Sequence, residues 1–196
     1  MKTLRLVALV VVLAVACAAS RAHASGPMWF TPFGGVAMPV GNFSDRASTG
    51  FDFGVMAETK LDGPWSAGGE LGWYQFGGND DLEKQLSALY GASTNVTTRT
   101  IPLTIWAKLG FDAKAFNPYA KFGFGGYFSR TRFEYLNRDV DNTDNVLGVI
   151  LAGGFTRDMT SNVRWGGELD YHWIGTENKA SQMLELRATL GFGGGK

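Results

Sequence analysis

One short segment concentrates side chains that could do chemistry. In WGGELDYHWIG, Trp165 to Gly175, Glu168, Asp170 and His172 stand at every second position among aromatic residues and glycines. Part of the segment occurs earlier as GGELGWYQFG, with Glu70 placed 98 residues before Glu168. Alternating positions lie on one face of an extended strand. The function of these acids therefore depends on the environment of that face.

Two candidate reaction or binding sites can be assembled from the polar residues. His172, Ser129, Ser181 and Glu177 could supply a serine–histidine–acid set of the kind that performs acyl transfer. The stretch DVDNTDN, Asp139–Asn145, resembles the start of a calcium loop. It lacks the glycine at the sixth position, and Ile150 stands where the bidentate glutamate belongs. We therefore expect a solvated acidic loop there, and no metal.

The first 24 residues predict a cleaved signal peptide. Lys2 and Arg5 precede an apolar run, and Ala22-His23-Ala24 provides a cleavage site. The run is shorter than the roughly 20 residues that a membrane span needs. Lipidation of Cys17 is a competing interpretation, but Ala14 stands where lipoprotein signals usually carry leucine. We expect a signal peptide at 1–24 and one domain at 25–196.

Composition excludes several classes for the exported chain. Without the three cations of the signal, the chain has 15 basic and 18 acidic residues. It therefore lacks the excess of positive charge that is typical of nucleic-acid-binding proteins. Cys17 leaves with the signal, so disulfides are not available. All 27 glycines and six tryptophans remain, a composition that fits neither a helical nor a disordered protein.

Alternation with period two indicates eight strands of about ten residues. One face is apolar, as in Leu184, Leu186, Ala188 and Leu190, and the other is polar or small. Pro32, Pro39 and two glycines blur the phase of the first strand, Phe30 to Val40. The connections alternate between short turns, such as LDGP, and long polar loops. This predicts an all-β, closed up-and-down antiparallel barrel with all short turns at one rim.

The polar face carries nearly balanced charge, which suits a narrow closed interior because an unpaired buried charge costs several kcal/mol. The predicted lumen charge network is Asp52, Glu58, Lys60, Glu70, Lys108, Lys121, Arg164, Glu168, Asp170, Glu185 and Arg187. The apolar face would contact lipid, and tryptophans near the strand ends would form interface girdles. These interface aromatics are Trp65, Trp73, Trp165 and Trp173.

With these features, the chain resembles the small eight-stranded outer-membrane barrels, the OmpA/OmpX-like group and the outer membrane protein beta-barrel domain family. The resemblance spans Met28 to Phe192 and rests on GGVAMPVGNF, YAKFGFGGYF, the two GGEL strands and the alternating last strand. It implies a transmembrane β-barrel of the cell outer membrane with periplasmic short turns and extracellular long loops. Such barrels commonly end on an aromatic residue read by the insertion machinery, whereas here Phe192 is followed by Gly193 to Lys196.

The resemblance implies a monomer that contacts outer-membrane lipid, lipopolysaccharide and the barrel-insertion machinery, with no nucleic acid and no cofactor. We expect no enzymatic activity and a structural or surface-interaction role through the extracellular loops. A narrow conduit for small or apolar solutes and a lipid A-modifying enzyme are the alternatives. His172 faces the lumen by period, which favours a hydrogen-bonded structural histidine. In the longest loop, Leu82, Leu86, Leu89 and Tyr90 predict a short amphipathic helix folded over the rim, or a partner-binding surface.

Overall fold

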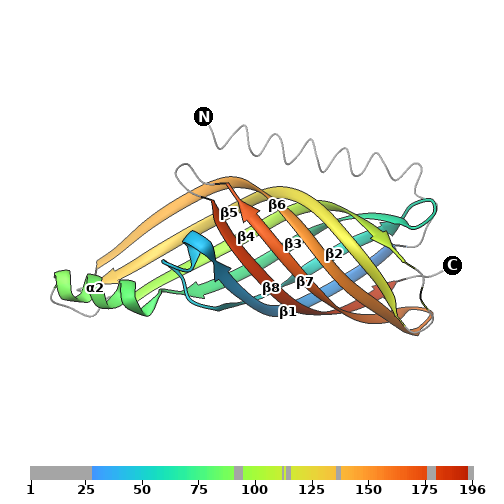
Figure 1. Ribbon diagram of the computed structural model, residues 1–196, viewed down its shortest axis with the longest axis horizontal. Coiled ribbons are helices and arrows are strands. Elements are labelled where there is room, and N and C mark those ends of the chain that lie inside the picture. The colour runs from blue at the N-terminus through green and yellow to red at the C-terminus, as the bar shows by residue number, and fades with distance from the viewer. Residues whose placement is uncertain are drawn as a thin grey trace.

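Antiparallel pairing runs from each strand to the next and returns from the last strand to the first, so the sheet closes into a barrel (Figure 1). The computed structural model describes residues 28–90, 95–111, 113, 116–135, 138–175 and 180–193. The strands are β1 (Met28–Val40), β2 (Gly50–Lys60), β3 (Trp65–Gly77), β4 (Asn95–Gly110), β5 (Asn117–Tyr135), β6 (Arg138–Thr160), β7 (Val163–Ile174) and β8 (Ser181–Gly193). The predicted fold class, an all-β closed barrel of eight antiparallel strands, is confirmed. The predicted signal peptide lies outside the described residues.

The short connections gather at one end of the barrel, which we call the short-turn rim. Trp29 of β1 pairs with both Glu58 of β2 and Gly193 of β8, so the start of β1 and the end of β8 lie at this rim too. The opposite end, the long-loop rim, carries the 3₁₀ turn η2 (Gly41–Phe43) and the helix α2 (Asp80–Tyr90). No helix in the described part of the chain is long and apolar enough to cross a membrane.

Burial shows an inverted polarity around the barrel wall. Leu186 is 59% exposed, whereas its neighbours Glu185 and Arg187 are 0% and 2% exposed. The same alternation leaves Phe122, Leu151 and other large apolar side chains about half exposed on the outer surface. A water-soluble barrel would bury these residues and expose the charged ones. The outer surface is therefore suited to contact with lipid, as in transmembrane barrels.

The structure resolves the phase of β1, which the sequence left open. Thr31, Phe33 and Ala37 are buried in the lumen, whereas Phe30 and Val36 are 51% and 46% exposed. The two prolines do not interrupt the strand.

The largest difference from the predicted strands is the length of β4, β5 and β6. They contain 16, 19 and 23 residues, and pairing of β5 with β6 continues to Tyr135↔Arg138. Asp139–Asn145, predicted to be a solvated acidic loop, is thus extended strand. The alternation of apolar and polar residues that predicts strands ends where the lipid-facing surface ends. The polar residues of the hairpin beyond that point still pair as strands in water.

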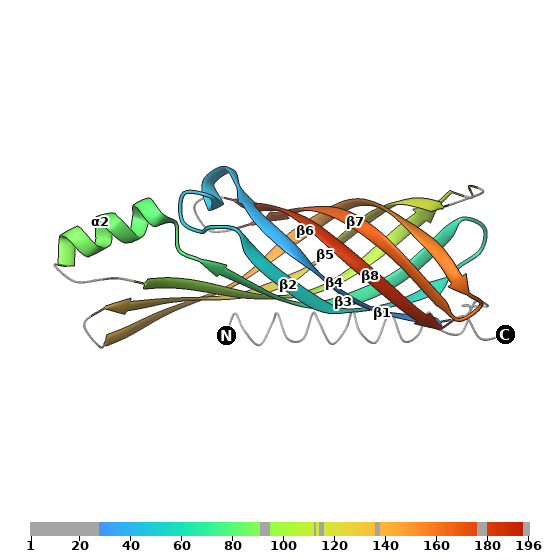
Figure 2. The same ribbon diagram turned by 90° about the horizontal axis from the view of Figure 1, so that it is seen from below.

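We call the part of β4, β5 and β6 beyond the long-loop rim, together with α2, the protrusion. Figures 1 and 2 show these strands running past the ends of the other strands, with α2 beside them. The helix predicted from Leu82, Leu86, Leu89 and Tyr90 is confirmed at Asp80–Tyr90. It extends away from the barrel end and does not fold across the rim (Figure 2).

Two adjacent glycines of β6 test the assignment of the two faces. A Cβ atom at Gly154 would lie 2.6 Å from the Gly167 carbonyl oxygen and from the Tyr119 hydroxyl, whereas at Gly153 its nearest neighbour would be 4.0 Å away. We expect Gly154→Val to lower the free energy of unfolding by about 1–3 kcal/mol through overpacking. The measurement is the urea midpoint of the detergent-folded protein, with gel mobility of unheated and boiled samples as the check on closure.

The matched control is Gly153→Val, which places the same side chain on the outer face. It should leave the midpoint and the gel shift close to those of the parent protein. Equal losses in both variants would contradict the assignment of faces.

Candidate functional site

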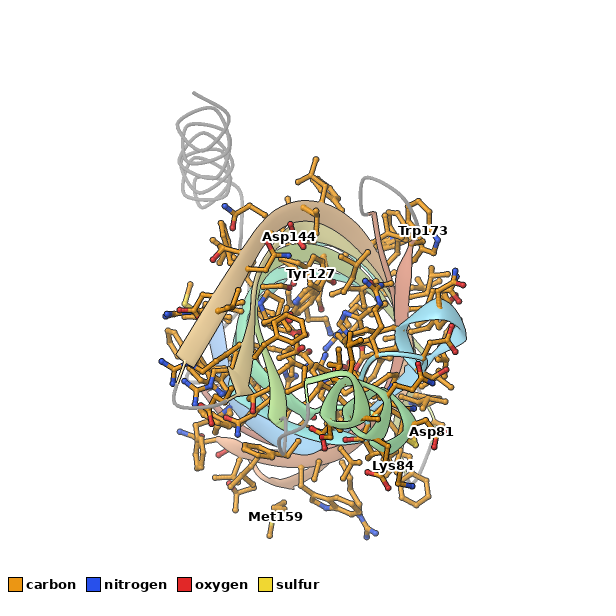
Figure 3. All side chains as sticks on the ribbon, turned by 90° about the vertical axis from the view of Figure 1, so that its left-hand side faces the viewer. Asp81, Lys84, Tyr127, Asp144, Met159 and Trp173 are labelled. Carbon is orange, nitrogen blue, oxygen red and sulfur yellow. The ribbon has the colours of Figure 1, made fainter. Side chains whose placement is uncertain are left out.

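Buried side chains from all eight strands point into the barrel lumen. Viewed from the long-loop end, Tyr127 points inward, whereas Trp173 and Met159 lie on the outside (Figure 3). The lumen has an apolar layer near the long-loop rim, a charged layer below it and a smaller ion-paired group toward the short-turn rim. The apolar layer consists of Ala37, Ala47, Tyr74, Phe76, Tyr127, Ile174 and Met183.

Arg187 of β8 is the centre of the charged layer. Its Nη1 and Nη2 atoms each donate a hydrogen bond to one carboxylate oxygen of Glu70, both at 3.0 Å. Its Nε atom lies 2.8 Å from an oxygen of Glu168 and 2.8 Å from one of Asp170. Nη1 is also 3.2 Å from Glu185. One guanidinium thus compensates four carboxylates contributed by three strands, which a fully buried cation requires.

Lys121 of β5 provides the second cation of this layer. Its Nζ atom is 2.6 Å from Glu168, 3.2 Å from Asp170 and 3.5 Å from Glu70. The Tyr119 hydroxyl donates to the other oxygen of Glu168 at 2.7 Å. Glu168 and Glu70, the two repeated glutamates, therefore share both Lys121 and Arg187.

The group toward the short-turn rim is built around Glu58 of β2. One carboxylate oxygen lies 2.5 Å from Lys108, and the other accepts a hydrogen bond from Arg164 at 2.6 Å. Lys108 and Arg164 also lie over the rings of Tyr119 and Trp29, at 4.8 and 4.4 Å from the centroids. These aromatic faces help to compensate for desolvation of the two cations.

His172 is fully buried and hydrogen-bonded at both ring nitrogens. Its Nδ1 atom is 2.8 Å from the Tyr127 hydroxyl and its Nε2 atom is 2.9 Å from Glu185, which also accepts from the Tyr74 hydroxyl. Ser129 instead pairs with Thr100 at 2.9 Å. The structure therefore does not bring His172 and Ser129 together as nucleophile and base, and Glu177 lies outside the described residues.

Asp170, His172 and Glu185 place potential ligand atoms within 4.8 Å of one another. This arrangement does not fit a metal ion. Arg187 already contacts both carboxylates, and the imidazole nitrogen is engaged with Glu185. A second cation at this position would be repelled by the guanidinium.

The structure places ten of the eleven residues of the predicted lumen network inside the barrel, nine of them buried and Arg164 partly buried. Lys60 is the exception and corrects the prediction, because it is exposed at the last position of β2, on the short-turn rim. Alternation assigns a residue to a face, but it does not show whether that residue lies within the barrel or at its end. Asp52 is buried near Glu185, Arg187 and Glu70.

The sequence did not identify the uncharged partners of this network. Phe33 lies under Arg187, with the guanidinium carbon 4.3 Å from the ring centroid. Tyr74, Tyr119 and Tyr127 donate or share hydrogen bonds with the charged groups and His172. Their position on the polar face was the only available signal, because the partners lie on strands distant in sequence.

The four predicted interface tryptophans lie on the outer face near the strand ends. Trp65, Trp165 and Trp173 are 47%, 39% and 45% exposed. Trp73 is half-buried, because it stacks on Phe53 at 6.4 Å between ring centroids and is covered by Arg99 at 5.8 Å.

Comparison with known proteins identifies the family. The model of the outer membrane protein beta-barrel domain matches residues 7–193, and the chain belongs to this family. No curated protein matches the sequence. Among solved structures, Neisserial surface protein A is similar, with 17% identity, a TM-score of 0.57, and coverage of 86% of this chain and 99% of that one. Ail, the attachment invasion locus protein of Yersinia pestis, shows 8% identity, a TM-score of 0.59 and coverage of 86% and 98%. A major outer membrane protein of Thermus thermophilus shows 13% identity, a TM-score of 0.56, and coverage of 85% of this chain and 99% of that one. At these identities the likeness concerns the fold, and the protein is an outer-membrane β-barrel.

Removal of Arg187 should destabilise the barrel strongly. Arg187→Leu leaves four buried carboxylates without their main cation, so we expect the free energy of unfolding to fall by about 3–5 kcal/mol. Arg187→Lys keeps the charge but loses the paired contact to Glu70, so its free energy of unfolding should lie between those of the parent protein and Arg187→Leu. Urea unfolding in lipid vesicles measures the free energy of unfolding of both variants.

Lys60→Gln is the matched control, because it removes a cation of the predicted network that lies outside the barrel interior. Its unfolding free energy should stay within about 0.5 kcal/mol of the parent value. A loss similar to that of Arg187→Leu would show that position 60 contributes to the network after all.

Proposed function

We propose that this member of the family is a non-enzymatic outer-membrane protein that acts at the cell surface through its protrusion. The observation that carries the proposal is the continuation of β4, β5 and β6 beyond the long-loop rim, the side that is extracellular in barrels of this kind. The transmembrane barrel then serves as a rigid anchor in outer-membrane lipid and lipopolysaccharide. Its assembly there would depend on the barrel-insertion machinery.

The strands of the protrusion are held by polar contacts suited to water. Arg130 pairs with Asp141 across β5 and β6, and this hydrogen bond lowers the pKa of the Asp141 carboxyl. The hydroxyl groups of Thr98 and Thr131 are hydrogen-bonded at 3.2 Å, which links β4 to β5. An ordered hairpin loses less conformational entropy on binding a partner than a disordered loop would.

The helix α2 is attached to the same structure. The Glu83 carboxylate accepts a hydrogen bond from the Val96 backbone N–H at 2.9 Å, and the Asn79 side chain accepts one from Asp81. Asn79 also donates to the Ser44 carbonyl at 2.8 Å. These contacts link the helix, the start of β4 and the first long loop into one surface.

One edge of the protrusion is open to strand addition. β7 pairs with β6 only from Gly148 onward, and the Leu147 carbonyl accepts a hydrogen bond from the Gly175 backbone N–H. In the described structure the β6 segment 138–146 therefore has β5 on one side and no strand on the other. Its backbone groups can pair with an extended partner segment. The exposed acids Asp141 and Asp144 disfavour antiparallel pairing of two copies, as charged edge strands generally do.

Two features favour this role over the alternatives. The side chains of a hydrolase-type site are not assembled in the described part of the chain, because His172 is enclosed by Tyr127 and Glu185. The lumen is occupied by the buried charged and apolar layers, which opposes a continuous conduit.

Among similar structures, Ail was also solved with the heparin analogue sucrose octasulfate. In this chain the protrusion carries acids and bases together, so a polyanion is only one of several ligands to test.

Removal of the hairpin tip should abolish surface binding and leave the barrel folded. Ser129 and Asp144 are directly paired, so residues 130–143 can be replaced by an Asn-Gly turn. Bacteria that display the parent protein are compared with the variant for adhesion to cultured epithelial cells, sucrose octasulfate-coated beads and one another. We expect the parent to raise adhesion in at least one assay and the variant to return it to the vector level.

A change at the opposite rim serves as the control for this experiment. Replacing Ser161-Asn162 with Asn-Gly alters a short turn and should leave both adhesion and the heat-dependent gel shift unchanged. Adhesion by the hairpin-deleted variant at the parent level would refute the role of the protrusion, as would a parent protein inactive in every assay.

Conductance distinguishes the surface role from the conduit. Because Arg187, Tyr127 and Met183 are at most 2% exposed inside the barrel, we expect the protein to give no steady conductance steps in planar bilayers. Stable, reproducible steps at neutral pH would favour the conduit.

A further inference from the structure

The barrel lumen contains a cavity between the charged layer and the ion-paired group around Glu58. Its volume is about 290 Å³, with the solvent at its opening included. One water molecule takes up about 30 Å³ in the liquid, so a small solute has room there. Arg164, the second residue of β7, lines the cavity close to the short-turn rim. We call this space the short-turn cavity.

Three buried polar atoms of the residues that line the short-turn cavity have no hydrogen-bond partner among the described residues. They are Thr31 Oγ1, Trp106 Nε1 and Arg164 Nε. The indole and guanidinium nitrogens can only donate a hydrogen bond, and a hydroxyl group can donate one as well. A buried donor without a partner destabilises the folded protein. The group that would satisfy all three atoms is therefore a hydrogen-bond acceptor.

Two of these atoms lie beside the same small space above Gly191 of β8. A Cβ atom at Gly191 would lie 2.9 Å from Arg164 Nε and 3.0 Å from Thr31 Oγ1. Arg164 is the cross-strand partner of Gly191 on β7, and Thr31 comes from β1 on the other side. Because glycine has no side chain, both atoms can reach one ligand there.

The wall of the barrel is less continuously paired at this position. Strand β1 itself is unbroken, but its pairing with β8 skips Thr31 and Pro32 and resumes at Phe33. Pro32 has no backbone N–H to donate. A ligand bound by Thr31 and Arg164 would connect β1 to β7 across this interruption.

The charges around the short-turn cavity indicate the sign of that ligand. Lys108 and Arg164 share the single carboxylate of Glu58, so this group has one positive charge in excess. Lys121 and Glu168, which line the side of the charged layer, pair with each other and add no net charge. In the described part of the chain, no other carboxylate lines the cavity. An anion with one negative charge would compensate the excess.

We propose that the short-turn cavity binds one small monovalent anion, such as chloride, between Arg164, Thr31 and Trp106. Arg164 Nε, Trp106 Nε1 and the Thr31 hydroxyl donate hydrogen bonds to it. The anion enters from the short-turn rim, which is the periplasmic side in barrels of this kind. It compensates the charge shared by Lys108 and Arg164 and stabilises that end of the barrel. This site is independent of the proposed role of the protrusion.

The test measures how chloride changes the stability of the protein folded in neutral detergent. Urea midpoints are recorded at constant ionic strength while chloride replaces gluconate, an anion too large for the site. An anion that binds only the folded state raises the midpoint as its concentration increases. We expect this rise with chloride and with bromide. In crystals soaked in bromide, the anomalous signal should lie between Arg164 and Thr31.

Variants of the donors should weaken the effect of chloride without unfolding the barrel. Thr31→Val and Trp106→Phe each remove one hydrogen bond to an ion and keep a side chain of similar shape. Each should need about tenfold more chloride than the parent protein for the same gain in midpoint. Gly191→Ala places a methyl group in the shared space and should abolish the dependence on chloride.

Thr104 supplies the matched control. Its hydroxyl oxygen is also buried and without a partner among the described residues, but Thr104 does not line the short-turn cavity. Thr104→Val should therefore keep the chloride dependence of the parent protein, whatever its own midpoint. Gel mobility of unheated samples establishes that each variant is folded.

Three results would overturn the proposal. The first is an equal midpoint of the parent protein in chloride and in gluconate, which would indicate that only water occupies the cavity. The second is the same chloride dependence in Thr31→Val, Trp106→Phe and the parent protein, which would indicate a general salt effect. The third is the absence of bromide from the cavity in the soaked crystals.

Discussion

The requirement to compensate buried charge governs the interior of this barrel. Arg187 is nearly inaccessible to solvent and contacts four carboxylates, each of which also lies within reach of another donor. A cation removed from water costs several kcal/mol unless such partners surround it. Because the partners come from β3, β7 and β8, the network forms only when the sheet is closed. Closure and charge compensation therefore stabilise each other.

Two cross-strand pairs in the wall place like charges opposite each other. Lys108 stands opposite Lys121, and Asp170 stands opposite Glu185. Arg187 compensates both acids from β8 itself, whereas the lysines are compensated from strands that do not neighbour theirs, Lys108 by Glu58 of β2 and Lys121 by Glu168 of β7. The dependence of the lysine pair on distant strands favours the closed barrel over partial assemblies in which these like charges would face each other. On the outer surface charged side chains must be absent from the apolar part, because they are unfavourable in contact with lipid chains.

The two ends of the molecule differ because their solvents differ. Within the membrane, the backbone hydrogen bonds must be made inside the barrel, which fixes the strand pairing. Beyond the long-loop rim, water permits an open edge on β6 and exposed ion pairs such as Arg130 with Asp141. Arg99 and Arg130, which face each other across β4 and β5, lie where these two regions meet.

Strand number and the two faces of β2 to β8 were predictable from residue alternation, a local property, and strand order from the alternation of short and long connections. Alternation placed Glu70 and Glu168 in the lumen and Leu186 outside. It missed the continuation of β5 and β6 through Asp139–Asn145, since a polar hairpin in water has no apolar face to detect. It also included Lys60 in the network, because phase does not give height along the barrel. Only the closed structure shows that Arg187 binds Glu70 across 117 positions of sequence, because the shear of the sheet, and not the local pattern, sets which residues meet in the lumen.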